Sequence, residues 1–284
     1  MLLKSISYWS FPGGLENTAD YGEVFARAKK AGYDAVEAAV GETGVLTPAS
    51  TEEQCREIAA AARRAGVKIA SVATGIYWGC SLSATDPKVR GKAVEYTKKM
   101  LRIASWLGTD ALLVVPGAVN VFFNPESELV SYDDVWKRAA ASIRKCLPTA
   151  RKVKVAMALE NVWNKFHLSP IELRDYIDSF DSEFVRVYLD VGNMLLYGYP
   201  EHWIRILGSR IKKVHFKDFR TSVGNGGGFV GLLEGDVNWP EVMKAFGEIG
   251  YTGPASVELG PYKYHWEASI YVISLQMDYI LGRR

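Results

Sequence analysis

The chain has 284 residues, of which 48% are hydrophobic, 23% charged and 12% aromatic, and its formal net charge is +2. This composition is typical of a globular protein with a sizeable core, and the small net charge gives no signal for a nucleic-acid or membrane partner. No apolar run reaches the roughly 18 residues needed to span a bilayer, and the N-terminus lacks the pattern of a signal peptide. Cys55, Cys80 and Cys146 are odd in number and far apart, which argues against a disulfide framework and favours a reducing cytoplasm.

Short strand-like segments alternate with longer amphipathic segments eight times along the chain. Strands are expected at residues 4–11, 33–40, 67–75, 110–117, 153–161, 184–192, 211–219 and 254–260. Helices are expected at residues 19–31, 51–65, 87–107, 133–152, 169–180, 200–208, 239–249 and 264–282. This alternation predicts a parallel sheet, and eight units without a break in composition favour a single (β/α)8 TIM barrel over residues 1–284. A dinucleotide-binding fold is less favoured, because no G-x-G-x-x-G follows the first strand.

A glycine-rich run, GNGGGFVG at residues 224–231, follows the seventh expected strand. It is not followed by the Gly-Lys-Ser/Thr of a phosphate-binding P-loop. We therefore favour a mobile loop over a substrate lid or a phosphate contact.

Charged side chains stand at the ends of several expected strands, where a TIM barrel carries its active site. The second strand carries Glu37, the fifth ends in Glu160, the sixth ends in Asp190, the seventh carries His215 and the eighth ends in Glu258. Three carboxylates and an imidazole would repel one another and stay poorly solvated in the mouth of a barrel. A divalent cation removes that conflict, and three oxygen donors with one nitrogen suit Mn²⁺, Co²⁺, Mg²⁺ or Zn²⁺. Each residue taken alone could equally be an isolated polar residue at a strand end.

The alternation of side chains along a strand predicts which of them face the barrel interior. In VHFKDFR, Val214 and Phe216 share one face and suit packing against the outer helices. His215 and Lys217 then point inward. The same period places Glu160 and Glu258 on the inner faces of their strands.

At these residues the sequence resembles the xylose isomerase-like TIM-barrel sugar isomerase/epimerase superfamily. Within it, the sequence is most similar to ketose 3-epimerases of the L-ribulose/L-xylulose 5-phosphate and ketohexose types. The resemblance covers essentially the whole chain, and its motifs follow in the family's order: LSATDPKVRGKAVEYTKKMLRIASWLGTDALLVVPG (82–117), ALEN (158–161), LDVGN (189–193), VHFKD (214–218) and EGDVNWPEVMKAFGEIGYTGPASVEL (234–259).

The resemblance implies one divalent ion, with Mn²⁺ or Co²⁺ favoured over Mg²⁺ or Zn²⁺, held by Glu160, Asp190, His215 and Glu258. It also implies that Glu160 and Glu258 act as the acid/base pair of an epimerase, which inverts C3 of a ketose or ketose phosphate through a cis-enediolate. Two alternatives use the same site: an aldose–ketose isomerase of the hydroxypyruvate type, and a lyase similar to inosose dehydratase.

Substrate contacts are expected from residues around these ligands. Many free-sugar 3-epimerases have a histidine where this chain has Asn193, so LDVGN with HFKD is more similar to the 5-phosphate branch. Lys217 and Arg220 are then candidate phosphate contacts, although Lys217 could instead form an internal ion pair and Arg220 could be a solvated loop residue. The remaining candidates are a carboxylate and three aromatic side chains that could stack on a sugar: Glu37, Tyr8, Trp78 and Trp163.

Two other classes of protein share the barrel. A DNA-repair enzyme of the endonuclease IV type needs several more histidines than the four present, and basic loops as well. A non-catalytic binding barrel is disfavoured because both acid/base glutamates are retained. We therefore expect a small sugar or sugar phosphate as partner, with no nucleic acid and no membrane, and the resemblance implies a homodimer or tetramer.

Overall fold

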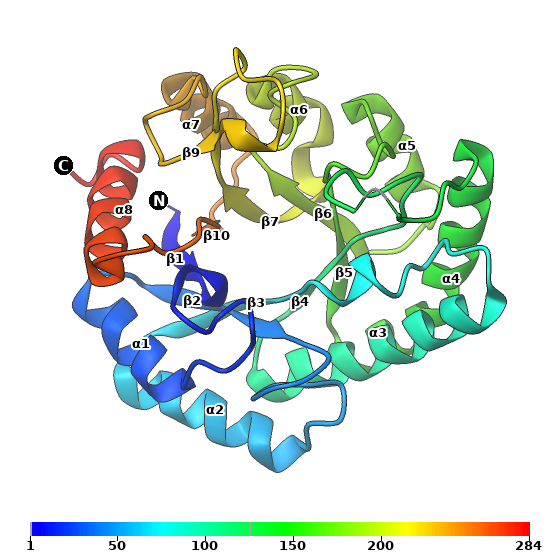
Figure 1. Cartoon of the computed structure of the whole chain (residues 1–284), viewed down its shortest axis with the longest axis horizontal. Coiled ribbons are helices and arrows are strands. Elements are labelled where there is room, and N and C mark those ends of the chain that lie inside the picture. The colour runs from blue at the N-terminus through cyan, green and yellow to red at the C-terminus, as the bar shows by residue number, and fades with distance from the viewer. Residues whose placement is uncertain (1, 125) are drawn as a thin grey trace.

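The computed structural model describes residues 2–124 and 126–284 and confirms the predicted TIM barrel. The parallel strands close into a barrel in the order β1-β10-β7-β6-β5-β4-β3-β2. Their bounds are β1 Leu3–Ser7, β2 Ala35–Val40, β3 Lys68–Thr74, β4 Ala111–Val114, β5 Ala156–Glu160, β6 Val185–Asp190, β7 Ile211–Phe216 and β10 Pro254–Val257. Figure 1 looks along the barrel and shows these strands inside a ring of helices.

The α-helices of the outer ring also lie where the sequence predicts them. Their bounds are α1 Tyr21–Lys30, α2 Glu52–Ala65, α3 Pro87–Leu107, α4 Tyr132–Val153, α5 Pro170–Asp178, α6 Pro200–Leu207, α7 Trp239–Glu248 and α8 Trp266–Ile280. Local sequence fixes several of their ends. Thr51 and Gln54 form a capping box at the start of α2, and Gly66 ends that helix with a positive φ of 74°.

Strand β7 shows the two faces that the alternation predicts. On the outer face, the ring of Phe216 packs against Trp239, with 4.8 Å between ring centroids, and against Phe246. On the inner face, His215 pairs in register with Asp190 of β6 and with Ser256 of β10. The register therefore brings the ends of these strands to one level of the barrel.

The chain after β7 forms a short hairpin, where the sequence predicts one strand up to residue 219 and then a loop. Strand β7 ends at Phe216, and the antiparallel strands β8 (Asp218–Phe219) and β9 (Phe229–Val230) follow. The glycine-rich run 224–231 thus includes a turn and one strand of this hairpin. The carboxylate of Asp218 anchors this segment, because it accepts hydrogen bonds from Trp239 Nε1 and from the backbone N–H groups of Phe219, Leu233 and Val237.

The three cysteines are buried free thiols. Within the described ranges, no helix combines the length and the apolar character that a bilayer span requires.

Candidate metal centre and active site

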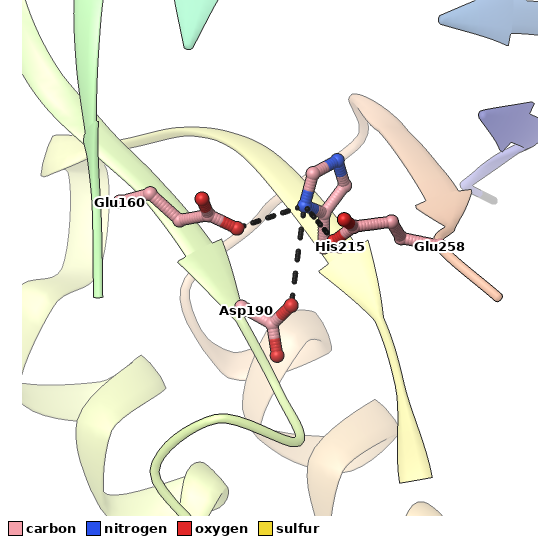
Figure 2. A group of neighbouring side chains, drawn as sticks. All are labelled: Glu160, Asp190, His215 and Glu258. Carbon is pink, nitrogen blue, oxygen red and sulfur yellow. Dashed lines mark hydrogen bonds and ion pairs between the residues drawn. The ribbon is translucent and has the colours of Figure 1, made fainter. Parts of the chain in front are cut away.

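Four side chains from neighbouring strands meet at the C-terminal mouth of the barrel. Glu160 ends β5, Asp190 ends β6, His215 lies in β7 and Glu258 directly follows β10. One ligand atom from each lies within 4.8 Å of the others. Figure 2 shows the three carboxylates directed at Nδ1 of His215, at 3.0 Å for Glu160 Oε1, 3.1 Å for Glu258 Oε2 and 3.9 Å for Asp190 Oδ2. The four predicted ligands are therefore brought together.

The donors of this cluster fit a divalent cation. His215 and Asp190 are completely buried and Glu160 is almost so, yet Nδ1 can carry only one proton for three facing carboxylates. Asp190 Oδ2 and Glu258 Oε2 are buried and accept no hydrogen bond of good geometry. Three carboxylates and one imidazole are a suitable donor set for Mn²⁺, Co²⁺ or Zn²⁺.

Asp190 is held with one oxygen turned toward the cluster. Its Oδ1 accepts hydrogen bonds from the backbone N–H groups of Gly192 (2.9 Å) and Asn193 (2.8 Å). The side chain of Asn161 also binds both the backbone N–H and the carbonyl of Asp190, each at 2.9 Å. Because the backbone satisfies Oδ1, Oδ2 is the oxygen that faces His215 Nδ1 and the cationic side of the cluster.

Glu37 lies behind His215 rather than in the pocket where substrate contact was expected. Its Oε1 is 2.8 Å from His215 Nε2, and its Oε2 accepts hydrogen bonds from the hydroxyls of Ser71 (2.8 Å) and Tyr188. Glu37 is completely buried. Its carboxylate therefore fixes the imidazole with Nδ1 facing the other three ligands, as carboxylates commonly do for metal-binding histidines.

Lys217 forms the ion pairs that the sequence left as an alternative to phosphate binding. Its Nζ lies 2.6 Å from Glu258 Oε2 and 3.1 Å from Asp190 Oδ2. Burial acts to lower the pKa of Lys217, but the charges of Asp190 and Glu258 outweigh it and raise that pKa above the ordinary value. Lys217 is therefore a fixed cation beside the cluster.

The two glutamates have opposite electrostatic environments. Burial raises the pKa of Glu160 to about 7. Burial acts in the same direction on Glu258, but the nearby charges of Lys217 and His215 dominate and lower its pKa to about 2. In the absence of a bound cation, Glu160 is the more readily protonated and Glu258 the more firmly ionised, a division typical of acid/base pairs.

A hollow of about 210 Å³ opens above the cluster, and both glutamates line it. The predicted contacts Trp78, Trp163, Asn193 and Lys217 line it as well, and so does Trp9, which follows the first strand. Three further aromatic side chains that the sequence did not single out complete the lining: Phe122, Phe123 and Phe229. The adjacent phenylalanines in VNVFFNP were the signal that could have identified this loop, since exposed aromatic pairs are uncommon away from binding sites.

Tyr8 and Arg220 lie away from this hollow. The completely buried Tyr8 donates its hydroxyl to the carbonyl of Ala19 (2.6 Å) and stacks on Tyr21. Arg220 is exposed and donates Nε to the carbonyl of Glu234 (2.9 Å) in the segment after the hairpin. Neither position supports the substrate contact expected of it.

His167, in the segment between β5 and α5, is a buried core residue. Its ring packs among Trp136, Phe166 and Tyr176, and neither ring nitrogen has a hydrogen-bond partner. Burial lowers the pKa of His167 to about 3. It is therefore a neutral side chain that belongs to the packing between α4 and α5.

Residues 25–274 match the family described as "Xylose isomerase-like TIM barrel". The chain belongs to this family. Among its relatives is the L-ribulose-5-phosphate 3-epimerase UlaE of Escherichia coli (strain SMS-3-5 / SECEC), which is 22% identical over 262 residues, 91% of this chain and 89% of the relative. Another is the D-psicose 3-epimerase of Ruminiclostridium cellulolyticum, 24% identical over 258 residues, 89% of this chain and 81% of the relative.

The xylose isomerase-like fold is also seen in solved structures. The crystal structure of an IOLI protein with a bound zinc atom aligns over 99% of each chain with a TM-score of 0.78 and 16% sequence identity. At 16% sequence identity, this structural similarity is evidence for the shared fold alone. The chain is thus a member of a sugar epimerase and isomerase superfamily, with a buried Glu/Asp/His/Glu cluster that is a candidate metal site.

Proposed function

We propose that this protein is a divalent-metal-dependent epimerase that inverts C3 of a ketose, with Glu160 and Glu258 as its acid/base pair. One observation carries the proposal: the two glutamates approach Nδ1 of His215 from opposite sides and line the same hollow (Figure 2). A carbon atom held between them could lose a proton to one carboxylate and gain a proton from the other. The 3-epimerase activities named for UlaE and for the D-psicose enzyme support this choice.

The chain's own residues divide the proton transfers. Glu258, which the fixed charge of Lys217 helps to keep ionised, accepts the proton from the carbon that lies next to the carbonyl and carries the neighbouring hydroxyl. The electron pair of that C–H bond forms a double bond to the carbonyl carbon, the π pair of the carbonyl moves onto its oxygen, and an enediolate results. Glu160 then donates a proton to the opposite face of the same carbon, the carbonyl re-forms, and the centre is inverted. In the reverse direction the two roles exchange.

Glu160, Asp190, His215 and Glu258 would hold the metal ion. When bound, the ion supplies Lewis acidity, which polarises the substrate carbonyl and stabilises negative charge on its oxygen. Lys217 adds a second fixed positive charge within the hollow. The rings of Trp78 and Trp163 supply an apolar wall that can exclude water and stack on the C–H face of a sugar.

The position of the new C–H bond tests this proposal. The protein, loaded with Mn²⁺ or Co²⁺, is incubated in D₂O with D-fructose, D-psicose, L-ribulose and their terminal phosphates, and products are analysed by NMR. We expect deuterium at C3 together with the C3 epimer. An aldose carrying the label at C2, or a ketose labelled at C1, would assign the site to an isomerase, and loss of a hydroxyl as water would assign it to a lyase.

A matched pair of variants tests the assignment of the base. Glu258→Gln removes the proton acceptor and should reduce exchange at C3 by at least about 100-fold, in line with the usual contribution of acid–base catalysis. Glu248→Gln on the exposed face of α7 should leave exchange unchanged, because that side chain binds only Arg205. Retained exchange in Glu258→Gln would contradict the role given to Glu258.

A further inference from the structure

Five aromatic side chains form a continuous band along one side of the active-site hollow. Trp78, Phe123, Phe122, Trp163 and Phe229 follow one another in contact, with 5.1 Å between successive ring centroids. They come from four separate loops at the mouth of the barrel, and each of them lines the hollow above Glu160 and Glu258. We call these five residues the aromatic band.

The outer part of the aromatic band is not covered by the protein. Phe122 is 45% exposed and Phe123 is 54% exposed, although both border the hollow. Two adjacent phenylalanines in contact with water at the rim of a pocket leave apolar area that a bound molecule can bury. The hydroxyls of a sugar would gain little binding free energy from these rings, whereas an apolar substituent would be stabilised by contact with them.

The charges around the hollow disfavour a phosphate group. Two further hollows, of about 390 and 320 Å³, adjoin the first at Glu258. Across the described residues that line the three hollows, Lys217 is the one cationic side chain, whereas Glu42, Glu160 and Glu258 are carboxylates. Lys217 is already paired with two carboxylates, so beyond the proposed metal position a phosphate dianion would find no arginine and no free lysine among these lining residues to bind it.

We propose that the substrate of this site is an unphosphorylated sugar with an apolar substituent remote from its carbonyl, and that Phe122 and Phe123 bind this substituent. The reacting carbon lies where both Glu160 and Glu258 reach, in the hollow of about 210 Å³. The remainder of the molecule then extends outward over the exposed rings. This inference rests on the proposed epimerase function for the reaction, but its claim concerns recognition and is tested separately.

Three ketoses that differ only at C6 test this claim: 6-O-benzyl-D-fructose, D-fructose and D-fructose 6-phosphate. Their dissociation constants are measured by quenching of tryptophan fluorescence, with and without Mn²⁺. We expect the benzyl ether to bind at least about tenfold more tightly than D-fructose, because an aromatic contact and the burial of apolar area both add binding free energy. We expect D-fructose 6-phosphate to bind more weakly than D-fructose. Tightest binding by the phosphate, or equal binding of the benzyl ether and D-fructose, would overturn the proposal.

Two variants test whether Phe122 and Phe123 cause the preference for the benzyl ether over D-fructose. The double variant Phe122→Ala/Phe123→Ala should bind the benzyl ether within about twofold of D-fructose, since the contact area is lost. Leu129→Ala is the control, because Leu129 is 78% exposed in the same loop but lines none of the three hollows. A benzyl preference that survives the double variant would contradict the role of Phe122 and Phe123. Binding as predicted without deuterium exchange at C3 would refute the epimerase function and leave this inference standing.

Discussion

Oε1 of Glu37 lies 2.8 Å from Nε2 of His215, on the side of the imidazole opposite to the proposed metal ligands. Glu37 belongs to β2 and His215 to β7, so the contact crosses the interior of the barrel. Through it, the hydroxyls of Ser71 and Tyr188 are also linked to the ligand cluster. The orientation of His215 is therefore set by a buried network whose residues are not among those lining the hollow.

Removing the charge of Glu37 should weaken metal binding. We expect Glu37→Gln to raise the dissociation constant for Mn²⁺ about tenfold or more, measured by isothermal titration calorimetry, because such partners orient the histidine and raise its basicity. Glu42→Gln, at an exposed position paired with Lys92, should leave the constant unchanged. Equal Mn²⁺ affinity in Glu37→Gln and the native protein would refute this role.

Lys217 should have opposite effects on metal affinity and on turnover. In Lys217→Met a cation beside Asp190 and Glu258 is lost, so Mn²⁺ should bind several-fold more tightly. In contrast, kcat for C3 exchange should fall at least about 100-fold, because the hollow loses a fixed positive charge that can stabilise the enediolate. Lys212→Met, which removes an ion pair with Asp110, serves as control. Weaker Mn²⁺ binding in Lys217→Met would show that the lysine shapes the ligand cluster instead.

His167 should make the fold sensitive to acid. Its pKa is about 3 in the folded protein against an ordinary value of 6.5, so between these values the unfolded chain binds the proton and the folded chain does not. Stability is therefore lost as pH falls from 6.5 toward 3, by roughly 3 kcal/mol between pH 7 and pH 4.

The variant His167→Phe should remove this part of the pH dependence. Urea unfolding at pH 7, 5.5 and 4 should give a flatter profile of unfolding free energy than the native protein, whatever the change in absolute stability. His202→Phe, at an exposed position, should leave the slope as it is. Parallel profiles for the native protein and His167→Phe would contradict a neutral buried His167.

Asp218 should stabilise the segment that carries Phe229. Its carboxylate accepts four hydrogen bonds, and Asp218→Asn would turn an amide N–H₂ toward some of these donors. We expect a loss of about 2 kcal/mol or more in unfolding free energy, typical of buried donors left without partners. Asp236→Asn, whose bonds to Thr221 are exposed, should cost clearly less; equal losses would argue against a special role for Asp218.

The candidate metal cluster could be predicted because each of its four side chains lies at a strand end. Once eight strands and their period of two are assigned, Glu160, Asp190, His215 and Glu258 must meet at one mouth of the barrel. Their common level then follows from the register of parallel neighbours, such as Asp190 beside His215. The sequence therefore contains the information for this part of the site.

Other parts of the site depend on contacts that no local period encodes. Glu37 and His215 are 178 positions apart, and only the packing of the barrel interior decides that they touch. Phe122 lies in a loop and Phe229 in the short strand β9, and neither segment has a repeating pattern, so their approach to Trp163 could not be inferred from spacing. The position of Tyr8 has a related cause. Tyr8 and Trp9 follow β1 directly, and the turn of the chain there buries Tyr8 and leaves Trp9 at the hollow.

The central claim is that two glutamates act on opposite faces of one carbon. The most direct test is to identify the hydrogen isotope at C3 of the first product molecules that form in D₂O. D-fructose is converted in D₂O by the Mn²⁺-loaded protein to a small extent, and the C3 epimer and the remaining D-fructose are separated and analysed by NMR. The account predicts one solvent-derived deuterium at C3 in the epimer and almost none in the remaining D-fructose, because removal and return use different carboxylates. An epimer that keeps its original hydrogen at C3 would contradict the account.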